Sequence, residues 1–181
     1  MDFLNAGFVT FPYLQSETAQ GAVLPYDDGR LAFFALMPEE GAEFEVWLNS
    51  LDGDTFTQIL ESRRDTEFRT LALPKFEAEW SGQLQDILSA LGLDLAFTFG
   101  EADFSLMGDN PNGYFLSQVI HAAKIEVNEQ GTEAAAATVV EAASGSAAPP
   151  ETGLTLIFDH PFLYGIVDLE TGVPLFLGTF E

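Results

Sequence analysis

The sequence predicts an α+β fold in which strands outnumber short helices. Three observations lead to this prediction. Apolar runs of strand length recur along the chain between turn residues, and the clearest is Arg30–Met37, which has the composition of a strand buried on both faces. Apolar residues at helical spacing occur in only a few short segments. The chain has 181 residues, 47% of them hydrophobic, so we expect one domain, residues 1–181, with an ample core.

The predicted strands alternate apolar and polar residues or form short apolar runs, bounded by turn formers such as Pro25–Gly29 and Glu170–Gly172. In the longest of them, alternation places His121 and Ile125 on one face and Lys124 on the other. The full set is Phe8–Phe11, Gly21–Leu24, Arg30–Met37, Glu67–Pro74, Tyr114–Val127, Leu154–Phe158, Phe162–Asp168 and Pro174–Leu177.

Three short helices are predicted between these strands. The first spans Phe44–Leu48. The second begins after Asp54, a good N-cap residue, and ends near Arg63, because a cation suits the C-terminal end of the helix dipole. The third is Ser81–Leu91, which has leucine and isoleucine at helical spacing and is followed by a glycine in the C-cap position.

The charge of the chain argues against several classes of partner. The formal net charge is −23 with only six lysines and arginines, so nucleic acid and anionic membranes are not expected to bind. No apolar run reaches the roughly 20 residues of a membrane span. Residues 1–5 lack the basic region and apolar stretch of a signal peptide. The absence of cysteine excludes disulfides and thiol catalysis but leaves the compartment open.

The residues give no pattern typical of an enzyme, a metal site or a cofactor site, so we expect none of these. There is no nucleophile elbow, phosphate loop or dinucleotide fingerprint. Asp52–Asp54 is too short for a calcium loop. His121 lies mid-strand among apolar residues and is interpreted as a core histidine, and His160 as a turn residue. A catalytic carboxylate pair of the glycosidase type stays open, although solvated surface carboxylates are the simpler interpretation.

Residues 129–151 form an unusual stretch of small side chains. From Thr132 to Ser144 every even position is small or apolar and uncharged, whereas both charged residues, Glu133 and Glu141, are at odd positions. Such parity would let the segment lie in a sheet with one face buried and both carboxylates in water. An alanine-rich helix and a flexible linker are the alternatives.

This stretch resembles the hinge of the reactive-centre loop in serpins, the conformationally trapping inhibitors of serine proteases. Further segments of the chain also resemble serpin segments and occur in the same order as in that family. They are Leu73–Phe76, the pair Leu91–Gly92 with Ala102–Ser105, Val119–Glu129, and Leu156–Ile166 with Leu175–Gly178. In Val119–Glu129 the family's usual lysine after His121 is replaced by Ala122. The Leu156–Ile166 stretch fits the C-terminal serpin signature at every constrained position.

The resemblance implies a serpin-like, mixed, multi-sheet fold and a suicide-substrate inhibitor. It places the reactive-centre loop at about residues 130–153 and the scissile bond at Gly145–Ser146. Lys75 is expected near Glu129, and His121 in a structural cluster. The hinge carried over from the family comprises Glu129, Gly131, Thr132, Glu133, Ala134, Ala135, Ala136, Ala137 and Thr138.

The same resemblance implies binding partners for the chain and leaves several interpretations of the chain open. The candidate cleavage positions are small, which favours an elastase- or subtilisin-like serine protease as target, and the family suggests an extracellular location. A serpin is roughly twice this length, so the resemblance covers only a C-terminal half. The expected fold is therefore incomplete, and an N-terminal serpin half is a possible partner. The chain could correspond to a truncated gene, a misplaced start, a split protein or a fragment, or to a non-inhibitory serpin-like protein.

Overall fold

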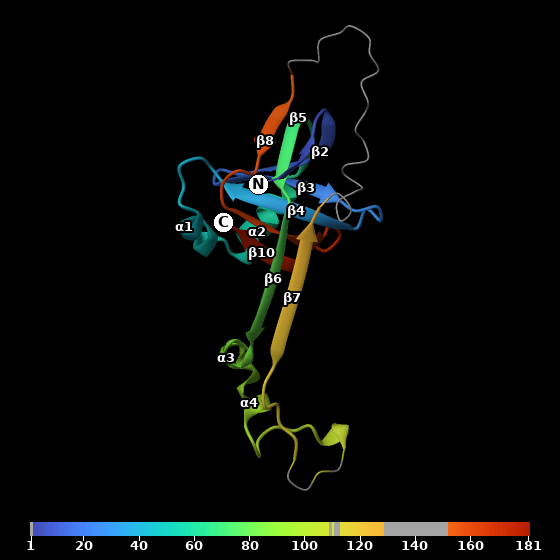
Figure 1. Cartoon of the computed structure of the whole chain (residues 1–181). Helices are drawn as coiled ribbons and strands as arrows, with labels where there is room; N and C mark the ends of the chain where they lie inside the picture. Colours follow the sequence, from blue (N-terminus) through green and yellow to red (C-terminus); the bar gives the residue numbers. More distant parts are fainter. Residues whose placement is uncertain (1, 109, 111–112, 129–151) are drawn as a thin grey trace. The chain divides into compact units, whose positions relative to one another are not determined.

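The computed structural model describes residues 2–108, 110, 113–128 and 152–181. The chain forms two compact units (Figure 1). Unit 1 comprises Met1–Phe76 and Val127–Glu181, and unit 2 comprises Glu77–Glu126.

Unit 1 is built on an eight-stranded sheet with the strand order β1-β5-β2-β3-β4-β9-β10, and β8 also pairs with β5. All pairs are antiparallel except β5 with β8. The long strand β5 pairs with β2 through Arg64–Phe68 and with β1 through Leu71–Pro74. The strands are β1 (Phe3–Ala6), β2 (Val9–Gln15), β3 (Ala19–Pro25), β4 (Leu31–Pro38), β5 (Arg64–Pro74), β8 (Leu154–Ile157), β9 (Phe162–Asp168) and β10 (Pro174–Phe180).

The central strand β4 confirms the predicted strand at Arg30–Met37. Its six inner residues, Ala32–Met37, are all buried, as expected for an apolar run covered on both faces. On one face Phe34 packs against Phe56, with 5.3 Å between ring centroids. On the other face Phe33 stacks with Tyr164 of the neighbouring strand β9 at 6.2 Å. The two faces of β4 therefore contribute to two separate parts of the core.

Helices α1 (Phe44–Ser50) and α2 (Gly53–Glu61) supply the side chains that cover one face of the sheet. The prediction that Asp54 caps α2 was wrong. Asp52 is the N-cap, because its extended backbone lets its carboxylate accept the Thr55 N–H at 2.8 Å. Asp54 lies in the first turn instead. Arg63 does lie beyond the end of the helix, and its guanidinium donates to the Leu60 carbonyl oxygen at 3.1 Å.

The hairpin between β9 and β10 turns where predicted, at Glu170–Gly172, and is organised by the buried Asp168. The Asp168 carboxylate accepts hydrogen bonds from Nε and Nη2 of Arg30 at 2.9 and 2.7 Å, and from the Glu170 N–H at 2.9 Å. Gly172 closes the turn in a left-handed conformation, with φ of 72°. The Arg30 side chain is the main cause of a pKa for Asp168 below its usual value.

Asp168→Asn should destabilise unit 1 at neutral pH and flatten its pH dependence. Because the folded-state pKa of Asp168 is lowered, its contribution is present above the unfolded pKa of about 3.9 and is lost as pH falls through the folded value. Urea unfolding of both proteins over a pH series should give a difference in unfolding free energy at pH 7 that narrows as pH falls below about 3.9. Glu170→Gln, at an exposed neighbouring position, is the control, and a difference that stays constant with pH would contradict the prediction.

Unit 2 contains a two-stranded sheet of β6 (Phe76–Gln83) and β7 (Ile120–Val127). Short helical elements come after β6 in the chain (Figure 1). The predicted helix Ser81–Leu91 was wrong at its start, because the chain stays extended to Gln83. The predicted strand Tyr114–Val127 becomes regular only at Ile120. The helical elements are α3 (Gln85–Leu88), the π-helical turn η1 (Ser89–Leu93), α4 (Asp94–Phe97) and the 3₁₀ turn η2 (Ser105–Met107). No helix in the described ranges is both long and apolar enough to span a membrane.

Candidate functional site

The predicted site is a loop of which the structure describes both flanks. The hinge Glu129–Thr138 and the bond Gly145–Ser146 lie outside the described residues, so their roles stay predictions. Strand β7 ends at Val127 on the N-terminal side, and β8 begins at Leu154 on the C-terminal side.

The N-terminal flank, β7, has one charged and one apolar face. Lys124 Nζ forms ion pairs with two glutamates of β6, Glu77 and Glu79, the latter at 3.0 Å. These ion pairs connect the charged face of β7 to β6. The hydrogen bond to Glu77 is the main cause of the raised pKa of Lys124. On the opposite face Ile125 is buried. The alternation predicted from sequence for this strand is therefore confirmed.

The C-terminal flank is held by a parallel strand pair. β8 pairs with β5 from Phe68↔Leu154 to Ala72↔Ile157, and the Phe158 N–H donates to the Ala72 carbonyl at 2.9 Å. Gly153 comes just before β8 with φ of 132°, and an added Cβ there would lie 2.9 Å from the Arg69 nitrogen. A glycine is thus required where the chain enters β8.

The two residues assigned structural roles lie in different units. Lys75 is half-buried, and its backbone N–H donates to the Asp2 carbonyl at 2.8 Å. Its expected partner Glu129 is outside the described residues, so that pair stays a prediction. His121 is exposed and lies 5.9 Å from Trp80 between ring centroids. The expectation of a core histidine is therefore not met among the residues that the structure describes.

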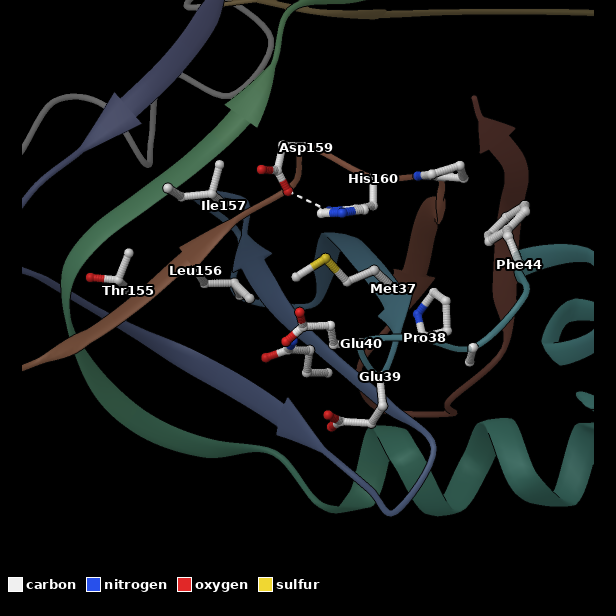
Figure 2. Close-up of a pocket in the computed structure, with 14 residues that line it drawn as sticks. Met37, Pro38, Glu39, Glu40, Phe44, Thr155, Leu156, Ile157, Asp159 and His160 are labelled. Carbon is white, nitrogen blue, oxygen red and sulfur yellow. Dashed lines mark hydrogen bonds and ion pairs between the residues drawn. The ribbon is translucent and has the colours of Figure 1, made fainter.

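A hollow of about 380 Å³ lies beside β8 in unit 1 (Figure 2). Met37 and Leu156 contribute apolar surface to it, and Glu39 and Glu40 contribute carboxylates. His160, predicted as a turn residue, lies at this hollow with its Nδ1 2.6 Å from Asp159 Oδ1. The lining contains no serine, cysteine or lysine. Throughout the described part of the chain, no three His, Asp or Glu side chains are grouped to hold a metal ion.

A sequence model of the serpins, serine protease inhibitors, matches residues 3–181, and the chain belongs to this family. An uncharacterized serpin-like protein from Thermococcus kodakarensis is 38% identical over 170 residues, covering 93% of this chain and 38% of the relative. Intracellular coagulation inhibitor 2 from Tachypleus tridentatus is 36% identical, covering 93% of this chain and 41% of the relative.

Solved structures show the same fold. The thermophilic serpin Tengpin in its native state matches with a TM-score of 0.79 at 31% identity, covering 98% of this chain and 45% of that chain. Its latent state matches with a TM-score of 0.71 at 26% identity, with the same coverage. The predicted mixed serpin fold is confirmed, and the chain spans less than half the length of these relatives.

Proposed function

We propose that a serpin containing this chain inhibits serine proteases by reactive-loop cleavage and strand insertion. The observation that carries the proposal is the parity of residues 132–144, whose even positions are all small or apolar and uncharged. The family is described as serine protease inhibitors, which supports the same activity. A bulky or charged residue at these positions would oppose burial of the segment in a sheet.

Strand insertion supplies the driving force for trapping. Some 14 residues at about 3.3 Å each extend roughly 45 Å, far enough to carry an acylated protease across the inhibitor. About a dozen new backbone hydrogen bonds at roughly 1 kcal/mol each would stabilise the inserted form by as much as a whole domain's folding free energy. Gly131 gives the backbone freedom to turn at the start of the inserting segment.

Thr132→Arg should convert the inhibitor into a substrate, because insertion would bury an unpaired guanidinium. The matched control is Glu133→Arg, which introduces the same side chain at an odd position, expected to face water. In a molecule that contains the rest of the serpin fold, a denaturing gel after mixing with protease should show a covalent complex for the control only. A complex at wild-type yield with Thr132→Arg would refute the mechanism.

The proposed target is an elastase- or subtilisin-like enzyme, and cleavage should fall between Ala142 and Ala148. The side chains before the candidate bonds are small, as a shallow specificity pocket requires, and no Lys or Arg follows Lys124 for a trypsin-like enzyme to recognise. Mass spectrometry of the C-terminal fragment should locate the cut after treatment with elastase or subtilisin. Trypsin should leave the region intact. A loop resistant to both elastase and subtilisin would overturn the target assignment.

A second candidate is a serpin-like protein without inhibitory activity. Under this alternative the loop is cut by the same enzymes, but no covalent complex forms even when the rest of the fold is supplied. The gel assay for the wild-type loop therefore distinguishes the two.

A further inference from the structure

Two hollows of unit 1 meet at the turn between β4 and α1. The first is the hollow of about 380 Å³ beside β8 (Figure 2). The second, of about 500 Å³, is lined by α1 and by the turn between β2 and β3. Glu39 and Ala42 line both hollows, and all of the lining residues belong to unit 1. We call the two hollows together the Glu39 groove.

Backbone hydrogen bonds hold the turn between β4 and α1 in place. The Glu39 N–H donates to the Thr18 carbonyl oxygen at 3.0 Å, and the Ala42 N–H donates to the Glu39 carbonyl oxygen at 3.1 Å. Gly41 lies between these bonds with φ of 88°, a left-handed conformation that favours glycine. The backbone at the centre of the groove is therefore tied to the neighbouring turn before any ligand binds.

The groove is lined by carboxylates and contains no lysine or arginine. Its four glutamates form no ion pair within the part of the chain that the structure describes; they are Glu17, Glu39, Glu40 and Glu43. Glu43 directly precedes α1, but its side chain makes no capping hydrogen bond to that helix. The fifth carboxylate, Asp159, lies 2.6 Å from a ring nitrogen of the histidine that follows it. A hollow lined by charges of one sign attracts ligands of the opposite sign.

The groove also has apolar surface and an unsatisfied hydrogen-bond donor. Ile157 of β8 is 39% exposed at the first hollow, and Val46 of α1 is 65% exposed at the second. Trp47 lines the second hollow but is only 5% exposed. Its Nε1–H is buried and has no acceptor among the described residues. Because buried indole N–H groups usually have a partner, an acceptor on a bound ligand would complete this one.

We propose that the Glu39 groove binds a basic segment of another polypeptide, one that carries lysine or arginine beside apolar side chains. The glutamates attract the cations, Ile157 and Val46 supply apolar contact, and a main-chain carbonyl of the segment accepts from Trp47. Nucleic acids and anionic membranes carry the wrong charge for this groove. None of the groove residues belongs to the predicted reactive-centre loop, so this binding does not depend on the proposed inhibition.

Isothermal titration of the chain with the peptide acetyl-Lys-Leu-Arg-Leu-Lys-amide tests the proposal. The peptide should bind, and its affinity should fall as the salt concentration rises, because salt screens exposed charges. Spermine carries the positive charge without apolar side chains or carbonyl groups. It should bind about tenfold more weakly, because removing one leucine side chain from water accounts for at least that factor. No binding of the peptide, or equal binding of spermine, would overturn the proposal.

Paired variants separate binding in the groove from general attraction to a chain of net charge −23. Glu39→Gln with Glu43→Gln should weaken peptide binding about tenfold, since each lost ion pair accounts for roughly twofold to fivefold. Glu61→Gln with Glu67→Gln removes the same charge from exposed positions outside the groove. This control should change the affinity by less than about twofold. Equal effects of the two double variants would mean that the peptide binds by net charge alone, which contradicts the proposal.

The fluorescence of Trp47 reports whether the peptide occupies the groove. Trp80→Phe leaves Trp47 as the only tryptophan of the chain. In this variant the emission of Trp47 should shift as the peptide saturates the chain, because the surroundings of the indole change. An unchanged emission at saturation would show that the peptide binds elsewhere, and the groove would lose its assignment. Since these measurements need no protease, their failure is distinguishable from failure of the proposed inhibition.

Discussion

Phe34→Ala should lower the free energy of unfolding by about 3–5 kcal/mol, the cost typical of emptying a buried phenylalanine site. Phe34 has no exposed surface and lies in the cluster that joins β4 to α1 and α2. Its ring contacts Phe56 of α2, so truncation removes packing on both the sheet and the helix. Because small domains are stable by only about 5–15 kcal/mol, the variant should unfold at a much lower urea concentration.

Phe8→Ala is the matched control for this measurement. Phe8 is 46% exposed and has φ of 55°, a strained conformation that alanine would share with phenylalanine. The same chemical change should therefore cost less than about 1 kcal/mol there. Equal losses for the two variants would show that the cluster around Phe34 does not support the sheet.

Gly165→Ala should be nearly as damaging, although it adds only one methyl group. Gly165 lies in β9 opposite Phe34 of β4, and an added Cβ would be 2.1 Å from the Phe176 carbonyl oxygen and 2.9 Å from the Phe34 ring. A backbone oxygen cannot rotate away as a side chain can. Overpacking of this kind costs about 1–3 kcal/mol and occasionally more.

Gly53→Ala provides the control for added volume. A Cβ at Gly53 would meet nothing within 4 Å, and the residue begins α2, where alanine is favourable. Thermal unfolding should show a lower Tm for Gly165→Ala and an unchanged or higher Tm for Gly53→Ala. A wild-type Tm for Gly165→Ala would mean that β9 and β10 can move apart at little cost.

Much of the sheet could be predicted from sequence, because continuous apolar runs and clear turns specify buried strands. β4 and β9 were found in this way, and Phe162–Asp168 was found with its observed bounds. β1 was missed, since a strand of four residues carries too little periodicity. β6 was missed for two reasons. The leucines after Ser81 have helical spacing, which favoured a helix. The alternation of Ala78, Trp80 and Gly82 with glutamates is too short to indicate a strand clearly.

Physical reasoning from the sequence predicted less of the site than of the fold. Alternation in residues 132–144 indicated that the segment could enter a sheet, but the assignment as a hinge depended on resemblance to a family. His121 shows why side-chain environments were harder to predict. The pattern around it correctly placed it on the same face of β7 as Ile125, but burial depends on what covers that face, and His121 is exposed in the part of the chain that the structure describes.

The arrangement of β8, β9 and β10 determines what a cut in the predicted loop would leave behind. All three strands follow that loop, yet β9 is hydrogen-bonded between β4 and β10, and β8 is hydrogen-bonded to β5. A nicked chain would therefore remain one particle in gel filtration and separate only under denaturing conditions. Its refolding would become an association of two peptides, with a midpoint that depends on protein concentration, whereas the intact chain refolds at a rate independent of concentration.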